Sequence, residues 1–572
     1  RPWMLADALH SRPLPLNYGA RSGFSKQNPD IRVLMGSNDG FFHMFQNTEA
    51  STTCGDTDTS GEVDGDEAPC TESGKENWAF MPREVMDTVK AHRNGVVPIG
   101  SPVHPIGVDG EPMVMIDAGD DKATIDSGEG DTAWVFFGLR RGGAAYYGMD
   151  ISDPDEPELM WRIDANTPGF EELALTFSTP TPAVVMYGDE PVRVLVFGGG
   201  YYGDGGRMAT SDTTPRKGYD NYDSTVAPDL SGTEPKGNAI YIVNAETGDL
   251  IWKAVDNGAI TTNGTTGVVF DNNTGLDHSI VAEIAVVDGN EDDIDERAYV
   301  GDMGGNIWRI DLPRNLDPAD DADNRDNWKV TKLAALGDGG ANGGDDDRRF
   351  MNRIDVVFAD DPNSSPGTFD ALVIGSGDRE HPKQTAREDY LFVIKDPYGT
   401  SVPTSGASAA VGIDDLANAD CFLVSGAPTS GCTNAADLLD NGYKLPLTEP
   451  GEKVLSPTLT IGGQGYFSTY LPEGGPTEAA ECNAMKLGIG RGYAVSLFNG
   501  RPVINRNITD DNGLESPTTS ADRWEDDSWG SGIPTEYQSL GGNYIMGRPG
   551  AFQNANVSSY YRTYWYEKDV DH

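Results

Sequence analysis

Acidic residues at a regular spacing between two cysteines are the clearest candidate for chemistry in this sequence. The stretch CGDTDTSGEVDGDEAPC covers residues 54–70, with Asp56 at the first position of a twelve-residue loop and a glycine at the sixth. This spacing is that of an EF-hand loop, in which alternate residues turn oxygen ligands toward one Ca²⁺ ion. The sequence therefore predicts a calcium site with the ligands Asp56, Asp58, Ser60, the Glu62 carbonyl, Asp64 and Glu67.

A second acidic loop, DGNEDDIDERAYVGD, covers residues 288–302. Its ligands would be Asp288, Asn290, Asp292, the Ile294 carbonyl and Glu296, at loop positions 1, 3, 5, 7 and 9. Asp293 stands where an EF-hand has glycine, and aspartate tolerates the left-handed backbone that this position needs. Position 12 is a tyrosine, so no closing glutamate is present. A solvated acidic hairpin tip is the alternative interpretation.

The five cysteines suggest disulfides that close loops. Cys54 and Cys70 flank the first acidic loop, and Cys421 and Cys432 flank a second polar segment. Close pairs of this kind are typical of an oxidising compartment, and no C-x-x-C motif of a zinc or redox site occurs. A Cys54–Cys70 bond would clamp the first calcium loop. Cys482 is left over, either free or competing for Cys421 or Cys432.

The charge balance limits the partners. The chain has 42 basic and 91 acidic residues, so its net charge is 42 − 91 = −49. Such a polyanion repels nucleic acid and anionic membranes and favours divalent cations, cationic partners or a saline habitat. No run of about 18 apolar residues predicts a transmembrane segment. The chain begins at Arg1 without a visible signal peptide, which suggests a fragment of a longer secreted protein.

Short apolar runs separated by glycine and polar turns must position these loops. A strand, a glycine-centred turn and a second strand recur at residues 32–46, 133–154, 298–312 and 371–396. Residues 237–253 fit two further strands joined at a Glu-Thr-Gly turn. Irregular repeats of this kind favour an all-β propeller, with a β-sandwich as the alternative. We expect one domain over residues 1–572, with its main inserts at 50–76, 203–236 and 399–440.

Several segments in order along the chain resemble the C-terminal domain of PilY-type proteins, the tip-associated biogenesis factors of type IV pili. They are LADALHSRP (5–13), GSNDGFFHMF (36–45), NWAFMP (77–82), GLRRGGAAYYGMDISDPDEPELMW (138–161), AYVGDMGGNIWRIDL (298–312) and RTYWYE (562–567). The resemblance implies a modified seven-bladed β-propeller with long loop insertions. It also implies that the family's calcium loop corresponds to residues 288–296, and that an N-terminal part of the full-length protein is absent here.

The same resemblance implies a function and a location. It predicts a calcium-binding protein that supports type IV pilus assembly and extension, opposes retraction when calcium is bound, and contributes to surface adhesion. The implied partners are minor pilins and the pilus-tip complex, together with host or abiotic surfaces. The implied location is the cell surface, at the pilus tip or associated with the outer membrane. The loop between Cys54 and Cys70 would then be an added structural calcium site.

No catalytic motif is evident, so a non-catalytic protein is expected. The seven histidines are scattered, and neither H-E-x-x-H nor G-x-S-x-G occurs. One alternative is a quinoprotein dehydrogenase, whose propeller blades carry a motif echoed by NAETGDLIWK at residues 244–253. Only one convincing copy is present, and no pair of adjacent cysteines occurs. A generic calcium-stabilised surface adhesin is a further alternative.

Overall fold

The computed structural model describes most of the chain. It covers residues 7–21, 23–51, 72–86, 89, 106–119, 124–126, 128–188, 190–201, 237–256, 269–271, 275–314, 324–337, 348–361, 367–379, 382–397, 410–423, 432, 434–472, 488–504, 519–525, 533–534, 536–540, 544–548 and 551–554. Within this part, none of the helices has the length and apolar character needed to span a bilayer.

In the described part of the chain, seven antiparallel-rich sheets follow one another in chain order, and we number them blades 1 to 7. Blade 1 contains β1 (Leu14–Asn17), β2 (Ile31–Gly36), β3 (Phe42–Thr48) and β4 (Glu72–Phe80). Blade 2 contains β5 (Met113–Asp117), β6 (Thr132–Gly138), β7 (Ala145–Asp150) and β8 (Glu158–Asp164). Blade 3 contains β9 (Thr181–Tyr187), β10 (Glu190–Gly198), β11 (Ala239–Asn244), β12 (Leu250–Val255) and β13 (Val269–Asp271).

Blade 4 contains β14 (Ala285–Val287), β15 (Arg297–Gly301), β16 (Asn306–Asp311), β17 (Lys329–Ala335) and β21 (Val411–Gly412). Blade 5 contains β18 (Asp355–Asp360), β19 (Thr368–Gly375), β20 (Tyr390–Asp396), β22 (Ala417–Asn418) and β23 (Gly442–Pro446). Blade 6 contains β24 (Lys453–Val454), β25 (Leu459–Ile461), β26 (Gln464–Leu471), β27 (Ile489–Ser496) and β28 (Trp524–Glu525). Blade 7 contains β29 (Gln538–Leu540), β30 (Tyr544–Arg548) and β31 (Ala551–Asn554).

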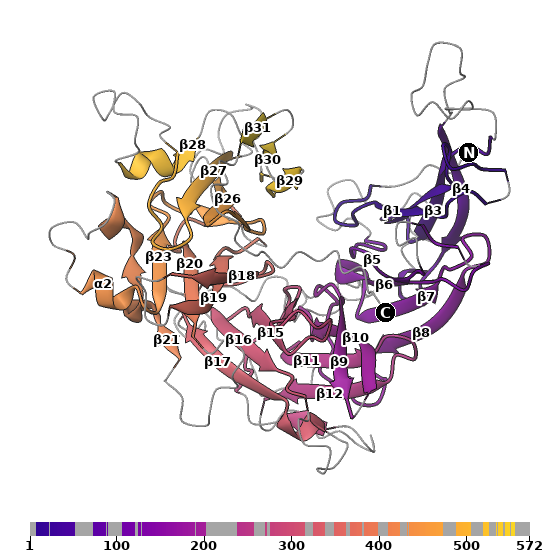
Figure 1. Ribbon diagram of the computed structural model, residues 1–572, viewed down its shortest axis with the longest axis horizontal. Coiled ribbons are helices and arrows are strands. Elements are labelled where there is room, and N and C mark those ends of the chain that lie inside the picture. The colour runs from indigo at the N-terminus through magenta and orange to yellow at the C-terminus, as the bar shows by residue number, and fades with distance from the viewer. Residues whose placement is uncertain are drawn as a thin grey trace, which may run out of the picture.

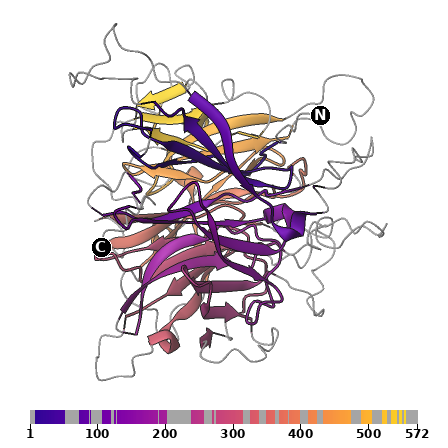
Figure 2. The same ribbon diagram turned by 90° about the vertical axis from the view of Figure 1, so that its right-hand side faces the viewer.

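Helical structure in the described residues is short. It consists of α2 (Ala435–Leu438) and the 3₁₀ helices η1 (Arg83–Val85), η2 (Arg140–Gly142), η3 (Asn324–Asn327), η4 (Ile413–Asp415), η5 (Ala419–Phe422) and η6 (Ser520–Arg523). Figure 1 shows the blades arranged around an arc in sequence order, from the indigo blade 1 to the yellow blade 7. In the perpendicular view of Figure 2 the sheets lie as successive layers. The all-β propeller expected from the sequence is therefore confirmed.

Apolar side chains fill the spaces between neighbouring blades. Separate buried clusters join blades 1 and 2, 2 and 3, 3 and 4, 4 and 5, and 5 and 6. The cluster between blades 3 and 4 includes Val196 and Ile242 on one side and Val300 and Trp308 on the other. Strands with both faces buried need nearly continuous apolar sequence, which explains runs such as AIYIVN in β11.

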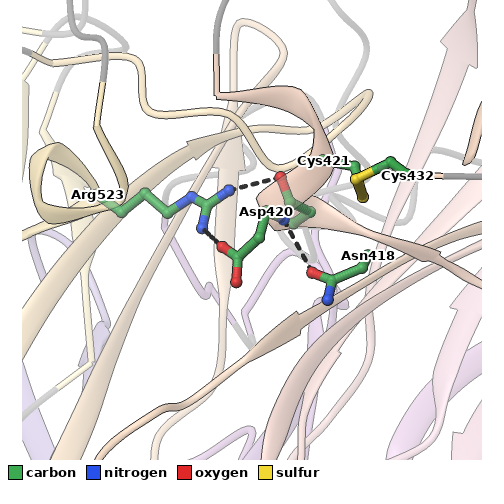
Figure 3. The surroundings of a disulfide bond; sticks show 6 residues. Asn418, Asp420, Cys421, Cys432 and Arg523 are labelled. Carbon is green, nitrogen blue, oxygen red and sulfur yellow. Dashed lines mark hydrogen bonds and ion pairs between the residues drawn. A yellow bond between two sulfur atoms is a disulfide. The ribbon is translucent and has the colours of Figure 1, made fainter. Parts of the chain in front are cut away.

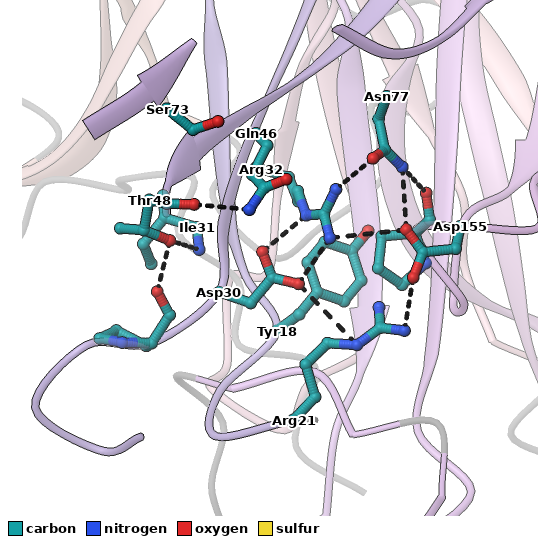
Figure 4. A network of polar contacts seen from close by, with 12 residues as sticks. Tyr18, Arg21, Asp30, Ile31, Arg32, Gln46, Thr48, Ser73, Asn77 and Asp155 are labelled. Atoms are coloured by element: carbon teal, nitrogen blue, oxygen red, sulfur yellow. Dashed lines mark hydrogen bonds and ion pairs between the residues drawn. The ribbon is translucent and has the colours of Figure 1, made fainter. Parts of the chain in front are cut away.

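A polar network with a buried arginine–aspartate pair at its centre also ties blade 1 to blade 2. The Nε and Nη2 groups of Arg32 on β2 donate to the two oxygens of the Asp30 carboxylate, at 2.6 and 2.8 Å, and neither residue is appreciably exposed. Arg21 binds Asp155 of blade 2 at 2.8 Å, and Asn77 on β4 donates to the same carboxylate at 3.0 Å. Figure 4 shows this network extending from blade 1 to the β7–β8 connection of blade 2. Bidentate pairing to planar carboxylates makes these contacts geometrically specific.

The insert at residues 399–440 contributes strands to two blades. Its described part adds β21 to blade 4 and β22 to blade 5, each in parallel pairing. The expected Cys421–Cys432 pair is present as a disulfide in this insert. Next to the disulfide, Arg523 contacts the Asp420 carboxylate and donates to the Ala419 carbonyl at 2.7 Å (Figure 3). The expectation of one domain over 1–572 stays a prediction.

Candidate metal site on blade 4

The second acidic loop is the connection of a short hairpin in blade 4. Strands β14 and β15 pair antiparallel, with Val287 opposite Arg297, and residues 288–296 join them. The strands are fully buried, whereas Asn290, Glu291, Asp292 and Asp293 at the loop tip are exposed. The sequence folds this way because the apolar run AEIAVV ends at an aspartate and resumes at AYV, which confines the acids to the turn.

Asp288 organises the loop by accepting hydrogen bonds from its backbone. One carboxylate oxygen accepts from the N–H groups of Asn290 at 3.1 Å, Glu291 at 2.8 Å and Asp292 at 3.4 Å. The other oxygen accepts from Asp293 N–H at 2.9 Å. Because Asp288 accepts hydrogen bonds from successive N–H groups, the chain bends back toward this first loop position. The ligand oxygens of the later loop residues are thereby directed to the same side as Asp288.

Two non-glycine residues take up the left-handed backbone that this bend requires. The φ angles are 64° at Glu291 and 66° at Asp293. Asp293 is the sixth loop position, so the expected left-handed conformation there is confirmed. Such a conformation is uncommon outside glycine, with Asn and Asp the usual exceptions, and strained backbone is characteristic of ligand-binding loops.

Three carboxylates converge inside the turn. Asp288, Asp292 and Glu296 each offer an oxygen atom, and these atoms lie within 4.8 Å of one another. Asn290 joins them, since its side-chain N–H donates to Glu296 at 2.5 Å and its side-chain oxygen accepts from Asp292 N–H at 3.1 Å. The four expected side-chain ligands of this loop are therefore brought together. Ile294 is buried, and its N–H donates to the Asp292 carboxylate at 3.2 Å.

The electrostatics of the loop favour a cation. Burial, followed by the negative charges of Asp288 and Asp292, raises the pKa of Glu296, although the Gly289 N–H and Arg314 act in the opposite direction. At Asp292 burial is the largest influence and acts to raise the pKa, but the hydrogen bonds from Arg314 and the Ile294 N–H, with the charge of Arg314, together outweigh it and the pKa is lowered. The loop thus holds carboxylate charge that it does not neutralise internally, a condition that bound divalent ions relieve.

Arg314 is the residue at this site that the sequence did not reveal. Its guanidinium contacts the Asp292 carboxylate and lies 3.5 Å from Glu296 Oε1. It comes from the segment after β16, so no local spacing links it to the loop. Its positive charge stands between two of the proposed ligands, where a metal ion would compete with it.

Anchors at the C-terminal end of the loop connect it to both neighbouring blades. The buried Asp295 carboxylate accepts from Val184 N–H of β9 at 2.8 Å, and Asp295 N–H donates to the Val184 carbonyl at 2.7 Å. Arg297 forms an ion pair with Asp370 of β19 at 2.8 Å. The loop is therefore fixed between blades 3 and 5 and is not an unsupported hairpin tip.

The residues present fit an oxygen-liganded cation. Carboxylate, amide and carbonyl oxygens are the ligands that Ca²⁺ and Mg²⁺ take in proteins, and calcium accepts six to eight of them in flexible geometry. The set contains no histidine or cysteine, which argues against a transition-metal site. Among the described residues this triad is the single group of three or more metal-ligating side chains.

The first acidic loop lies outside the described residues, as does Cys482. This applies to both cysteines of the Cys54–Cys70 pair and to the proposed ligands Asp56, Asp58, Ser60, Glu62, Asp64 and Glu67. The calcium site at residues 56–67 therefore stays a prediction.

Fold and site together define a β-propeller with a cation-compatible acidic loop on its fourth blade. No family model matches the chain. The type IV pilus biogenesis factor PilY1 of Pseudomonas aeruginosa (strain UCBPP-PA14) is 26% identical over 340 residues, which cover 56% of this chain and 22% of that protein. A PilY1 homolog of Xylella fastidiosa is 21% identical over 498 residues, 82% of this chain and 28% of that protein.

The crystal structure of the Pseudomonas aeruginosa PilY1 C-terminal domain matches with a TM-score of 0.54 and 19% identity, over 94% of each chain. The resemblance to PilY-type proteins is thereby confirmed, and the described fold is that of their C-terminal domain. The matched part spans about a fifth to a quarter of the length of these curated relatives.

Proposed function

We propose that this chain is the non-catalytic, calcium-binding propeller of a type IV pilus biogenesis factor. In this role it supports pilus assembly and extension at the cell surface, together with minor pilins at the pilus tip. Calcium binding opposes retraction, and the same part of the protein contributes to surface adhesion. The convergence of Asp288, Asp292 and Glu296 on one turn is the observation that supports the metal assignment.

The side chains of Asp288, Asn290, Asp292 and Glu296, with the Ile294 carbonyl, would hold the ion. A bound Ca²⁺ would supply positive charge that relieves the mutual repulsion of the three carboxylates. Because Asp295 and Arg297 join the loop to blades 3 and 5, ordering of the loop would also stiffen those junctions. Calcium binding at the loop would in this way also act on the surface that the propeller presents to pilus partners.

Calorimetry on Asp288→Ala tests the metal assignment. The variant loses a ligand and the acceptor of four loop N–H groups, so we expect it to bind one calcium ion fewer than the wild type. The exposed Asp360→Asn on β18 is the matched control and should keep the wild-type stoichiometry. Extracellular calcium modules bind with a Kd of roughly 10⁻⁴–10⁻³ M, and the lack of a twelfth-position glutamate favours that range. Unchanged stoichiometry in Asp288→Ala would refute the assignment.

The calcium loop predicted at residues 56–67 needs a variant of its own. Asp56→Ala should remove a different ion, and the double variant should bind two fewer than the wild type. Calcium should also raise the melting temperature of the wild type, because a ligand that binds only the folded state stabilises it by mass action.

The pilus role is tested in cells that produce the full-length protein. Tagged protein should co-purify with minor pilins, and Asp288→Ala should reduce surface piliation where retraction is active while leaving protein abundance unchanged. Restoration of piliation by deletion of the retraction motor would support the anti-retraction role. A tagged protein that never accompanies minor pilins would exclude the pilus role while leaving the calcium result intact.

A further inference from the structure

A fully buried lysine meets two glutamates between blades 2 and 3. Lys253 on β12 stands opposite Tyr241 on β11, and neither side chain is exposed. Glu171 and Glu172 lie in the connection from β8 of blade 2 to β9 of blade 3. Lys253 Nζ contacts Glu172 Oε2 and lies 3.6 Å from Glu171 Oε2. One amine is therefore enclosed together with two carboxyl groups.

The surroundings of this group are apolar and closed to solvent. Glu172 exposes 2% of its surface and Lys253 none. Phe170 packs against Tyr241 with 4.9 Å between the ring centroids, and Lys253 Nζ lies 5.5 Å from the centroid of the Tyr241 ring. Charged groups are costly to hold in such a place, even as a pair. An amide in place of the Lys253–Glu172 ion pair would remove both charges.

The hydrogen bonds at the pair also match an amide better than an ion pair. Glu172 Oε1 and Glu171 Oε2 are buried and have no hydrogen-bond partner among the described residues, which is unfavourable for a carboxylate oxygen. Glu172 Oε2 accepts from the Tyr241 O–H at 3.3 Å, and Lys253 Nζ donates to the Gly169 carbonyl at 2.9 Å. These contacts supply a donor for the carbonyl of a Lys253–Glu172 amide and an acceptor for its N–H. The oxygen that this amide would lose is the unpartnered Oε1.

The backbone holds the three side chains in place. The Glu172 carbonyl accepts from the Gly237 N–H at 2.9 Å, shortly before β11 begins. Glu171 Oε1 accepts from the Gly169 N–H at 3.0 Å, which keeps the other oxygen of this carboxyl beside Lys253. Groups that a fold holds in contact react as if they were present at a very high concentration. A reaction that is negligible between free side chains can therefore proceed here.

We propose that Lys253 Nζ and Glu172 Cδ become joined by an amide bond, with Glu171 as the acid–base residue. A proton passes from the Lys253 ammonium to Glu171, and the amine then attacks Glu172 Cδ and forms the C–N bond. Glu171 carries the two protons that leave Nζ to Glu172 Oε1, the C–Oε1 bond breaks, and one water molecule leaves. Nothing is oxidised or reduced, and no co-reactant is needed. The product ties the β8–β9 connection covalently to β12, independently of calcium and of the pilus role.

The intact mass of the purified wild-type chain, reduced and denatured, tests this proposal. We expect it to be lower than the mass of the sequence by one water molecule. A tryptic digest should contain a branched peptide that joins Glu172 to Lys253. Lys253→Met and Glu172→Ala should each have the full mass of their sequences. Glu158→Gln, which replaces an exposed glutamate on β8, is the matched control and should lose water as the wild type does.

A further variant tests the role of Glu171. Glu171→Gln keeps both groups that form the bond but cannot carry a proton between them. Purified in parallel with the wild type, it should largely keep its full mass, because a positioned acid–base group contributes about 10²–10⁴-fold to the rate. Water loss by Glu171→Gln to the same extent as the wild type would overturn this role.

Three results would overturn the cross-link itself. A wild-type chain of full mass would contain the ion pair only. Water is also lost when an Asp-Gly step cyclises, and the sequence contains several such steps, but that loss would persist in Lys253→Met. A branched peptide that joins other residues would likewise contradict the assignment. The wild-type mass and digest are decisive by themselves, so the test does not depend on whether Lys253→Met folds.

Discussion

The acidic loop of blade 4 and the buried network between blades 4 and 5 both gather carboxylates, but they differ in the cations that they supply. In the loop, three carboxylates face one another and a single arginine, Arg314, contacts two of them. The network pairs the carboxylates of Asp311, Asp370 and Asp396 with Arg297 and Arg309. The loop therefore carries more uncompensated negative charge, which a bound cation would relieve.

The buried network shows how carboxylates are held where arginines accompany them. Between blades 4 and 5, Arg309 binds Asp311 and Asp396, and Tyr299 contacts Asp370 and Asp396 at 2.8 Å each. All are buried. A phenol has one proton, so one of its two contacts requires a proton on a carboxylate. Burial raises the pKa of Asp370, which favours this protonated form. The carboxylates of the network are thus paired with arginines, although Asp311 Oδ2 and Asp370 Oδ1 have no hydrogen-bond partner among the described residues.

The largest effect is expected from breaking this balanced network. Arg309→Ala would leave Asp311 and Asp396 buried without their cation, and loss of one partner of a buried pair typically destabilises by about 3–5 kcal/mol. Urea unfolding measures this change. Calcium stoichiometry below the unfolding transition should stay as in the wild type, because Arg309 does not contact the loop ligands. A decrease in unfolding free energy of less than about 1 kcal/mol, below the range for buried pairs, would show that the network does not stabilise the fold.

A smaller effect is expected from removing the arginine that competes at the loop. Arg314→Gln abolishes the guanidinium contacts to Asp292 and Glu296, so a calcium ion no longer has to displace them. We expect calcium affinity to rise by about tenfold, which corresponds to about 1.4 kcal/mol. Calorimetry measures the change, with Arg193→Gln as the control for a general gain of negative charge. Weaker binding in Arg314→Gln would mean that Arg314 supports the metal-bound loop instead of competing with the ion.

The sequence was informative where a function depends on neighbouring residues. Alternate oxygen donors from Asp288 to Glu296 are a local pattern, and the left-handed position of Asp293 followed from the same count. The repeated strand pairs and the Cys421–Cys432 disulfide are also local. Each depends on distances of a few residues along the chain, which the spacing of residue types records directly.

Contacts made by the closure of the ring have no local signature in the sequence. Arg314 reaches the acidic loop from beyond β16, and Arg12 meets Glu536 across 524 residues of sequence. The strand additions of the 399–440 insert were missed for the same reason, since parallel pairing to another blade leaves no local pattern.

The smallest predicted effect concerns Glu111, whose carboxylate lies 3.5 Å from Arg12. Burial raises the pKa of Glu111 to about 7, with Arg12 acting against the shift and Glu283 and Glu536 adding to it. A folded-state pKa above the ordinary value of 4.5 means that the fold prefers the protonated acid. The stabilisation is therefore complete below about pH 4.5 and is lost as the pH rises through about 7.

Glu111→Gln mimics the neutral acid and does not titrate. The unfolding free energy of Glu111→Gln should equal that of the wild type at low pH and exceed it by roughly 1 kcal/mol above neutrality. The difference is this small because solvent screens the charge of a partly exposed carboxylate. Urea unfolding of both proteins at several pH values measures the trend. A difference that stays constant with pH would show that the positive charge of Arg12 balances the ionised Glu111.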